Sequence, residues 1–505
     1  MQQQRMPMIG RILAAVLIAG GAAAGTIAAA DKAPESESVA KPRTNYDVEK
    51  APWPCLRGPY HNGMAPSTGL KFIDDAAAAR LVWRSDQPIP GNHPVREGDY
   101  WTGGYSGPIV AEGRVYLTYW VPAGRTNYNF RSGERGRNRN PVGDDRSADD
   151  VVHCFEAATG KTIWKQVFSG LGHANGSSKD GARHLTPCWW DGRIVAAGSA
   201  GLIYCLDAAT GEELWRGEHQ QLFAKYQQAK KTGPAIHAGC VGVADGVAAF
   251  GAGSGGRAGN APMNGFDVET GERLWTGVPS AGASSPATWI SGEGKEYFLI
   301  GNALAEPRSG KVLWKIPEIH CPVKQTVVGD FLVAQKYGEG KGVSTGPACY
   351  RISAAGFERL WAAEHAFFGA GSGYNNRTSA MVWDGHVYRP TGDRNAKKTT
   401  MNVYELVTGR LVAEHSFDRS ANRGALTLAY GPLVAEGRLF ACPTALHMYS
   451  LAPGGTKHLG CFPVQSTDTY PAYAGGFLYI RSSALPRKGG DGRAAHLLCY
   501  DLRVP

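Results

Sequence analysis

The sequence of 505 residues predicts an all-β fold, an eight-bladed β-propeller of four-stranded antiparallel blades, from three observations. An eleven-residue stretch recurs as CFEAATGKTIW, CLDAATGEELW and GFDVETGERLW, at residues 154–164, 205–215 and 265–275. A glycine turn after a short β-type run recurs eight times along the chain. The last repeat lacks a final strand, and a segment before the first repeat has the character to replace it.

Each repeat is expected to fold into four short strands joined by tight turns. Within residues 187–215, β-type runs alternate with turn sequences. In the last turn Asp207 and Thr210 can hydrogen-bond to local backbone, and Gly211 can adopt a positive φ. A sheet of this kind cannot bury both faces alone, so it must stack on copies of itself, as the blades of a propeller do.

A tryptophan closes the repeated stretch, always four positions after its glycine. A large side chain at this position is expected to wedge between blades, with its indole N–H bonded to a backbone carbonyl of the neighbour. The predicted blade-docking residues are Trp164, Trp215, Trp275, Trp314 and Trp361.

The turn glycines count the blades: they are Gly113, Gly192, Gly246, Gly294, Gly329, Gly385, Gly437 and Gly476. The eighth unit ends in LLCYDLRVP, without a tryptophan strand. The segment ARLVWRSD, at residues 79–86, precedes the first blade and reads as the missing strand. We expect it to complete blade eight, because a ring closed by both ends of the chain leaves no exposed sheet edge.

These repeats resemble those of the PQQ-like β-propeller proteins. The resemblance is carried by the pattern Asp-x-x-Thr-Gly-x-x-x-Trp at Asp207–Trp215 and Asp267–Trp275, with a near match at Glu156–Trp164. It spans residues 79–505, and WPCLRGPYHNG at Trp53–Gly63 looks like the leader segment of exported members. It implies the propeller fold, and one fold hosts unrelated activities.

Two kinds of function follow from the resemblance. Quinoprotein dehydrogenases of this group close an adjacent cysteine pair over the quinone and hold Ca²⁺ with a Glu, an Asn and an Asp beside a catalytic Asp. No two cysteines are adjacent in this sequence, and no local motif matches the calcium ligands. A second relative, the lipoprotein propeller of the outer-membrane β-barrel assembly machinery, is a binding module, although the lipid-anchor cysteine is missing here.

The sequence therefore predicts a binding or scaffold module without catalytic residues or a cofactor. The alternative is a PQQ-dependent oxidoreductase with calcium. The expected partner is an unknown protein or a small polar or anionic ligand, and the protein is expected to be a monomer. The net charge of +9 is mild for this length and its basic residues form no stripe, so nucleic acid is not an expected partner.

The segments just before the first strand of each blade are expected to reach the central channel. Their polar residues are Tyr105, His184, His237, Ser285, His320, Arg377 and Asp468. Such residues either hydrogen-bond to neighbouring loops or form a polar ring at the channel mouth, the expected ligand site. The three histidines are too widely spaced around an eight-bladed ring to hold a metal, so no metal site is expected. A small anionic or polyhydroxyl ligand, with Arg377 and the imidazoles as donors, fits better.

Residues 1–30 read as a signal peptide: two arginines, an apolar run and three alanines before Asp31. A retained membrane anchor is the alternative. Residues 31–78 are expected to be a flexible lead-in and leader segment, and residues 79–505 the propeller. The protein is expected to be exported, to the periplasm or the medium, with no stable membrane span after cleavage. Its ten cysteines are expected to form few disulfides, because most fall at equivalent positions of separate repeats.

Overall fold

The computed structural model places Ala40–Pro505 in one compact unit. It describes residues 41–90, 103–104, 106–122, 147–173, 185–219, 236–254, 262–279, 286–319, 326–337, 344–363, 380–391, 398–418, 432–441, 446–464, 469–482 and 495–504.

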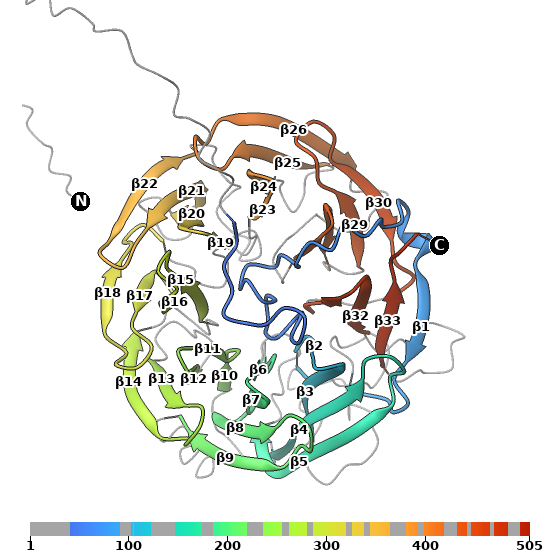
Figure 1. Ribbon diagram of the computed structural model, residues 1–505, viewed down its shortest axis with the longest axis vertical. Helices are drawn as coiled ribbons and strands as arrows, with labels where there is room; N and C mark the ends of the chain where they lie inside the picture. The colour runs from blue at the N-terminus through green and yellow to red at the C-terminus, as the bar shows by residue number, and fades with distance from the viewer. Residues whose placement is uncertain are drawn as a thin grey trace, which may run out of the picture. The chain divides into compact units, whose positions relative to one another are not determined.

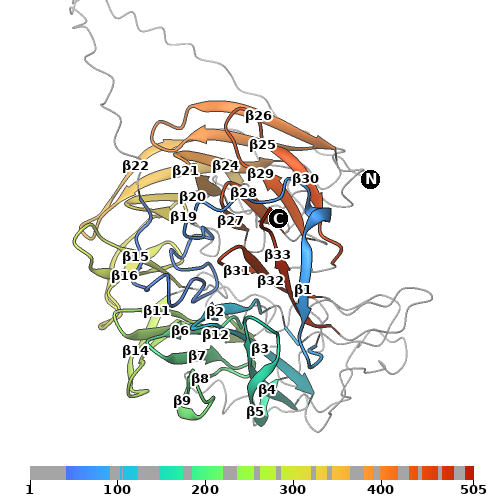
Figure 2. The same ribbon diagram turned by 45° about the vertical axis from the view of Figure 1, so that its right-hand side comes forward.

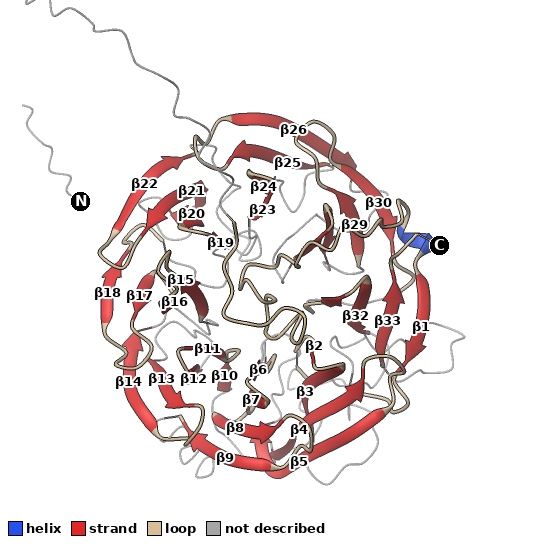
Figure 3. Cartoon of the chain, in the orientation of Figure 1, coloured by secondary structure: helices blue, strands red, loops and turns tan. Residues whose placement is uncertain are grey.

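Eight small antiparallel sheets stand in a ring around a central channel, which confirms the predicted eight-bladed propeller (Figures 1 and 3). In each blade the first strand lies nearest the channel and the last at the rim (Figure 1). Blades one to four are β2 (Ile109–Ala111), β3 (Arg114–Pro122), β4 (Ser147–Glu156), β5 (Thr162–His173); β6 (Cys188–Trp190), β7 (Arg193–Ala197), β8 (Leu202–Asp207), β9 (Glu213–Glu218); β10 (Ile236–Ala238), β11 (Gly242–Ala244), β12 (Val247–Ser254), β13 (Pro262–Asp267), β14 (Arg273–Pro279); and β15 (Ala287–Ile290), β16 (Glu296–Ile300), β17 (Ala303–Ala305), β18 (Val312–Lys315). Blades five to eight are β19 (Thr326–Val328), β20 (Phe331–Tyr337), β21 (Ser344–Ile352), β22 (Phe357–Ala362); β23 (Met381–Trp383), β24 (His386–Thr391), β25 (Lys398–Glu405), β26 (Leu411–Asp418); β27 (Leu433–Ala435), β28 (Arg438–Ala441), β29 (His447–Ser450), β30 (Lys457–Cys461); and β31 (Ala472–Ala474), β32 (Phe477–Arg481), β33 (Leu497–Asp501), β1 (Arg80–Arg84).

The ring is closed by the two ends of the propeller, as the displaced strand predicted. Strand β1 pairs antiparallel with β33, with Trp83 opposite Cys499, so blade eight has the order β1-β33-β32-β31. The indole N–H of Trp83 donates to the carbonyl of Ala157 in blade one at 3.0 Å.

The turn between the first and second strands is a two-residue hairpin in most blades. Asp191 has a φ of 42° and Gly192 a φ of 75°. A turn with both central residues at positive φ matches the twist of the strands it joins, and Asp-Gly is a preferred pair for it. The same pairing recurs at Glu112–Gly113, Asp245–Gly246, Asp384–Gly385 and Glu436–Gly437.

The five tryptophans at the ends of the repeats lie between blades. Each indole N–H donates to a backbone carbonyl of the following blade: Trp164 to Ala208 at 3.1 Å, Trp215 to Val268 at 2.8 Å, Trp275 to Pro307 at 2.6 Å, Trp314 to Ser353 at 2.8 Å and Trp361 to Leu406 at 2.8 Å. The ring of Trp164 packs directly against the repeat glycine of the following blade. A Cβ on Gly211, which has a φ of 76°, would lie 2.5 Å from this ring, so only glycine fits there.

The described part of the expected lead-in and leader segment, residues 41–78, is packed into the ring. Trp53, Phe72 and Ile73 are buried, and burying such apolar side chains offsets the entropy lost on ordering. The single turn η1 (Ala76–Ala78) follows. Within the described ranges, no helix has the length and apolar character needed to cross a bilayer.

Eight cysteines lie in the described part of the chain, and all of them are free thiols: Cys55, Cys154, Cys188, Cys205, Cys240, Cys349, Cys461 and Cys499. The expectation of few disulfides is confirmed for these residues. Cys321 and Cys442 lie outside the described residues.

Candidate functional site

The predicted polar ring falls almost entirely outside the described residues. Six of its members lie there: Tyr105, His184, Ser285, His320, Arg377 and Asp468. His237 belongs to β10, where its backbone pairs with Gly253, but its side chain is not described. The described chain on either side of these positions therefore defines the site.

Residues 43–68 form a plug inside the ring. We call the end of the channel that carries the turns between first and second strands the turn face. The opposite end, where the first strands begin, is the mouth face. Arg43 donates to Asp330 at 2.6 Å, and the N–H of Glu112 donates to the carbonyl of Lys50 at 2.7 Å. Both partners belong to turns of the turn face, so the plug starts there. Figures 1 and 2 show this segment crossing the centre of the ring.

From the turn face the plug reaches down the channel toward the mouth face. Trp53 pairs with Val110 in the middle of β2 through two backbone hydrogen bonds, of 3.1 and 2.8 Å. Further along, Arg57 donates to Oγ1 of Thr326, the first residue of β19, at 3.1 Å. The chain then returns, and the N–H of Thr68 donates to Glu436 in a turn of the turn face. Residues 55–57 are therefore the tip of the plug and the floor of the channel mouth.

Described residues beside the predicted ring meet near this tip. The N–H of Gly107 donates to Oγ1 of Thr186 at 3.0 Å. Gly107 is two residues from Tyr105, and Thr186 is two residues from His184. The two segments are therefore joined where they enter their blades.

The same holds on other sides of the channel. Thr326 both accepts from Arg57 and donates to the carbonyl of Ala380 at 2.7 Å, and Ala380 is three residues from Arg377. Leu56 packs in one buried cluster with Cys240 and Tyr470. These two residues follow the predicted ring members of blades three and eight by three and two positions.

Arg57 gives the floor a buried positive charge. Its side chain is 9% exposed, and its guanidinium also donates to the carbonyl of Asn62 at 2.9 Å. Burial lowers the pKa of Arg57 to about 10, so it stays protonated at neutral pH. A cation held in a low-dielectric site favours anions that come within reach. Arg57 was not among the predicted site residues, although it lies in the WPCLRGPYHNG segment that resembles a family leader.

A thiol and an imidazole brace the plug tip without forming a reactive pair. The Sγ of Cys55 lies 3.4 Å from Nδ1 of His61 and donates to the carbonyl of Gly58 at 3.2 Å. Burial raises the pKa of the Cys55 thiol well above its ordinary value and lowers the pKa of His61 to about 3. Both groups are neutral at pH 7, whereas a nucleophilic cysteine needs its thiolate. Their role is to shape the floor.

Comparison with known proteins agrees with the repeat pattern. Residues 148–318 match a family model described as outer membrane protein assembly factor BamB. The match covers about a third of the chain, and it agrees with the resemblance of the repeats to those of PQQ-like β-propeller proteins. A search of curated proteins finds no match to the chain.

Solved structures share the propeller at low identity. Quinohemoprotein alcohol dehydrogenase from Comamonas testosteroni matches with a TM-score of 0.52 and 13% identity, over 89% of this chain and 80% of that one. The quinohemoprotein alcohol dehydrogenase ADHIIG from Pseudomonas putida HK5 matches with a TM-score of 0.53 and 14% identity, over 89% and 80%. A europium-containing methanol dehydrogenase matches with a TM-score of 0.54 and 12% identity, over 90% and 98%. Likeness at these identities shows the fold alone.

Proposed function

We propose that this propeller is an exported binding module that holds a small anionic ligand, or an acidic group of a partner protein, at its channel mouth. The observation that carries the proposal is Arg57, a buried cation at the tip of the plug. Its partner Thr326 donates to Ala380, three residues after the predicted donor Arg377. The plug starts at the turn face, so we expect a ligand to approach from the mouth face.

The energetics favour an anion at this place. Hydrogen bonds to charged groups contribute roughly 1.5–3 kcal/mol each, more than those between neutral groups. Arginine presents a planar fork of donors that matches carboxylate and phosphate oxygens. The matching family model, described as an outer membrane protein assembly factor, supports binding as the function.

The alternative is the quinone-dependent oxidation that the names of the solved relatives state for those proteins. This sequence lacks the adjacent cysteines that the resemblance ties to the quinone. Equilibrium dialysis with pyrroloquinoline quinone and Ca²⁺ separates the two proposals. A binding module gives no dye reduction with alcohols or sugars, and stoichiometric quinone uptake with alcohol-dependent dye reduction would replace our proposal.

Sulfate is a suitable probe anion, because it keeps its charge between pH 5.5 and 7.5. We expect calorimetry to detect sulfate binding that Arg377→Ala weakens roughly tenfold or more, since about 1.4 kcal/mol is one decade. Binding should also strengthen as the pH falls toward 5.5, because imidazoles with an ordinary pKa near 6.5 become protonated.

Two further variants sharpen this test. Arg57→Lys keeps the floor charge but loses the fork, so it should weaken binding less than Arg377→Ala. Arg84→Ala removes an exposed arginine of rim strand β1 and should leave binding unchanged. Sulfate affinity that ignores both Arg377 and pH would rule out an anion site at the mouth.

A further inference from the structure

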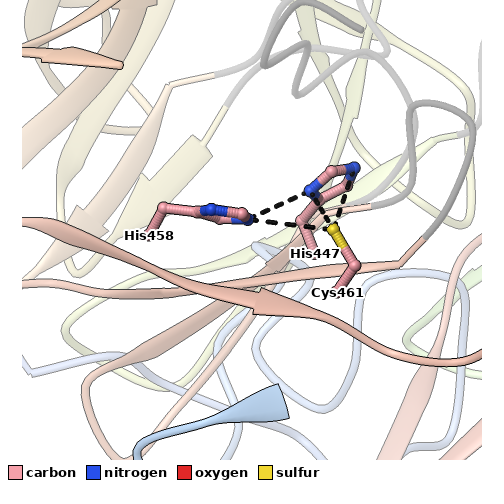
Figure 4. Close-up of side chains that lie close together, drawn as sticks. All are labelled: His447, His458 and Cys461. Atoms are coloured by element: carbon pink, nitrogen blue, oxygen red, sulfur yellow. Dashed lines mark hydrogen bonds between the residues drawn. The ribbon is translucent and has the colours of Figure 1, made fainter. Parts of the chain in front are cut away.

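Three metal-ligating side chains converge in the two outer strands of blade seven, away from the channel. Figure 4 shows His447 of β29 and His458 and Cys461 of β30 turned toward one another. Nδ1 of His447 lies 3.2 Å from Nε2 of His458 and 3.1 Å from Sγ of Cys461, and that Sγ lies 3.9 Å from Nε2 of His458.

A displaced β-bulge brings the three together. Three residues of β29, from His447 to Tyr449, face four residues of β30, from His458 to Cys461. Residues three apart on a regular strand point to opposite faces, and the extra residue turns His458 and Cys461 to the same face. Gly460, with a φ of 96°, supplies the left-handed backbone that this bulge needs.

Blades one to five each carry a bulge at a different place, and blades one and three have a second register shift. There the extra residue lies directly before the docking tryptophan, at Ile163, Leu214, Leu274, Leu313 and Leu360. Blade seven has no tryptophan at the end of its repeat. Its strands β29 and β30 pair without a shift at Ser450–Lys457 and Tyr449–His458, and the register shifts only after that. The shift therefore falls beside the histidines and the cysteine.

The separations match the edges of a metal coordination polyhedron. Tetrahedral zinc bonds of 2.0–2.1 Å to nitrogen and 2.3 Å to sulfur imply edges of about 3.3 Å between nitrogens and about 3.6 Å between nitrogen and sulfur. The three distances, of 3.2, 3.1 and 3.9 Å, each lie within about 0.5 Å of these edges. Small side-chain shifts would bring the three ligand atoms to zinc geometry.

Nδ1 of His447 cannot make a full hydrogen bond to both of its neighbours at once. Nδ1 of His447 faces both other atoms, and a neutral imidazole nitrogen either donates one proton or accepts through one lone pair. A single ion can bond to one lone pair of each of the three atoms.

The packing also holds the ligands in place. His447 is buried at 2% exposure, and Tyr449 packs beside both imidazoles, with ring centroids 6.2 Å from His447 and 4.9 Å from His458. His458 and Cys461 are half-buried. Three protein ligands with one side open to solvent leave a fourth position for water or another ligand, as in zinc sites that are not fully closed.

We propose that His447, His458 and Cys461 form a zinc site in blade seven, independent of the channel mouth. The ion takes two neutral imidazoles and one thiolate, and binding releases the thiol proton to solvent. Among the described residues, this is the group of three His, Cys, Asp or Glu side chains whose ligand atoms converge closely enough for one ion.

Cobalt is the spectroscopic probe for this site. The full-length protein, stripped with chelator and checked by circular dichroism, is titrated with Co²⁺ and then with Zn²⁺. We expect one equivalent of Co²⁺ with a cobalt–thiolate charge-transfer band and tetrahedral d–d bands, both abolished by one equivalent of Zn²⁺. A wild-type protein that takes up no stoichiometric Co²⁺, or takes it up without the thiolate band, overturns the proposal.

Variants locate the site on these residues. Cys461→Ser should remove the thiolate band, and His458→Gln should weaken Zn²⁺ binding at least tenfold. Cys205→Ser, which alters a buried thiol of blade two, and His386→Gln, which alters a half-buried histidine of β24, are the matched controls and should bind as the wild type does. Wild-type binding by Cys461→Ser, or loss of binding by the controls, would contradict the assignment.

Gly460→Ala tests the bulge with all three ligands intact. Alanine is strained at the φ of 96° that Gly460 adopts, and its Cβ would lie 3.1 Å from Oδ1 of Asp75, so the bulge must shift. We expect at least a tenfold loss of Zn²⁺ affinity with unchanged circular dichroism. Binding equal to the wild type would show that the bulge does not position the ligands, and would remove this part of the proposal.

Discussion

At the scale of single residues, two buried aspartates respond to their surroundings in opposite ways. The carboxylate of Asp150 accepts hydrogen bonds from the N–H of Ser199 and from the hydroxyl of Tyr204, both at 3.1 Å. Burial nevertheless outweighs these bonds and raises the pKa of Asp150 to about 6. Asp501 instead has its pKa held far below the ordinary value, chiefly by Arg503 and also by Arg80.

The pKa of Asp150 predicts a pH effect on stability. Because its folded pKa lies above its unfolded value, the folded state binds the proton more tightly, and this stabilisation is present below pH 4 and lost as the pH rises through 6. We expect Asp150→Asn to remove this pH dependence, because an amide does not ionise. The stability of the wild type relative to the variant should fall by roughly 2 kcal/mol between pH 4 and pH 7.

Urea denaturation of both proteins across this pH range measures the difference. Asp501→Asn serves as the matched control, because a carboxyl with a depressed pKa stabilises the fold above its unfolded pKa and loses that effect below it. The control should therefore differ from the wild type most above pH 4 and least near pH 2. A constant difference between wild type and Asp150→Asn at all pH values would mean that Asp150 keeps an ordinary pKa.

At the scale of the blade, the docking tryptophan joins one element to the next. Trp215 donates to Val268 at 2.8 Å, and a Cβ on Gly271 would lie 2.7 Å from its ring. We expect Trp215→Ala to cost roughly 3–5 kcal/mol, because it deletes a large side chain from a packed seam. Calorimetric unfolding measures this cost, and Leu214→Ala at the exposed neighbouring residue is the control, with a cost near zero.

The sequence predicts the blades well because the pattern is local and repeated. Asp207 and Gly211 lie in one turn, and Trp215 follows four residues later. Residues this close in sequence stay close in the folded chain, so their spacing predicts their arrangement. The bulge that gathers His447, His458 and Cys461 was not predictable in this way. Its position depends on pairing between β29 and β30 and on Gly460, and a shift of one residue reverses which face a side chain occupies.

The site at the channel mouth shows the same limit at the scale of the whole molecule. Arg377 and the histidines were predicted to lie near the channel from their position before each first strand. Residues 31–50 were predicted to be a flexible lead-in because they are polar, and Trp53–Gly63 resembled a family leader, so neither pattern predicted a plug in the channel. Only the closed ring brings Arg57 and Thr326, which are far apart in sequence, to 3.1 Å.

Closure of the ring depends on a strand that no turn ties to its own blade. Strand β9 continues from β8 through a short turn, whereas no turn joins β1 to β33. Blade eight holds β1 through strand pairing and through flanking backbone bonds, such as those of Ile73 to Leu502 and of Ile89 to Ala495. A Cβ on Gly160 would lie 2.4 Å from the ring of Trp83, which shows how closely this tryptophan packs against the next blade. Trp83 therefore couples blade eight to blade one.

We predict that Trp83→Ala opens the ring locally before the molecule unfolds. The cavity lowers the free energy that holds β1 in place by roughly 3–5 kcal/mol. Because no turn ties β1 to its blade, we expect this loss to favour local opening of β1 over global unfolding. Hydrogen–deuterium exchange without denaturant should then show faster exchange at residues 80–84 and 497–501, while residues 213–218 keep their protection. In Trp215→Ala, with a similar total cost, the covalently joined β9 should resist local opening, so exchange should rise evenly across the propeller. Unchanged protection of residues 80–84 in Trp83→Ala would show that the pairing of β1 with β33 closes the ring without the tryptophan.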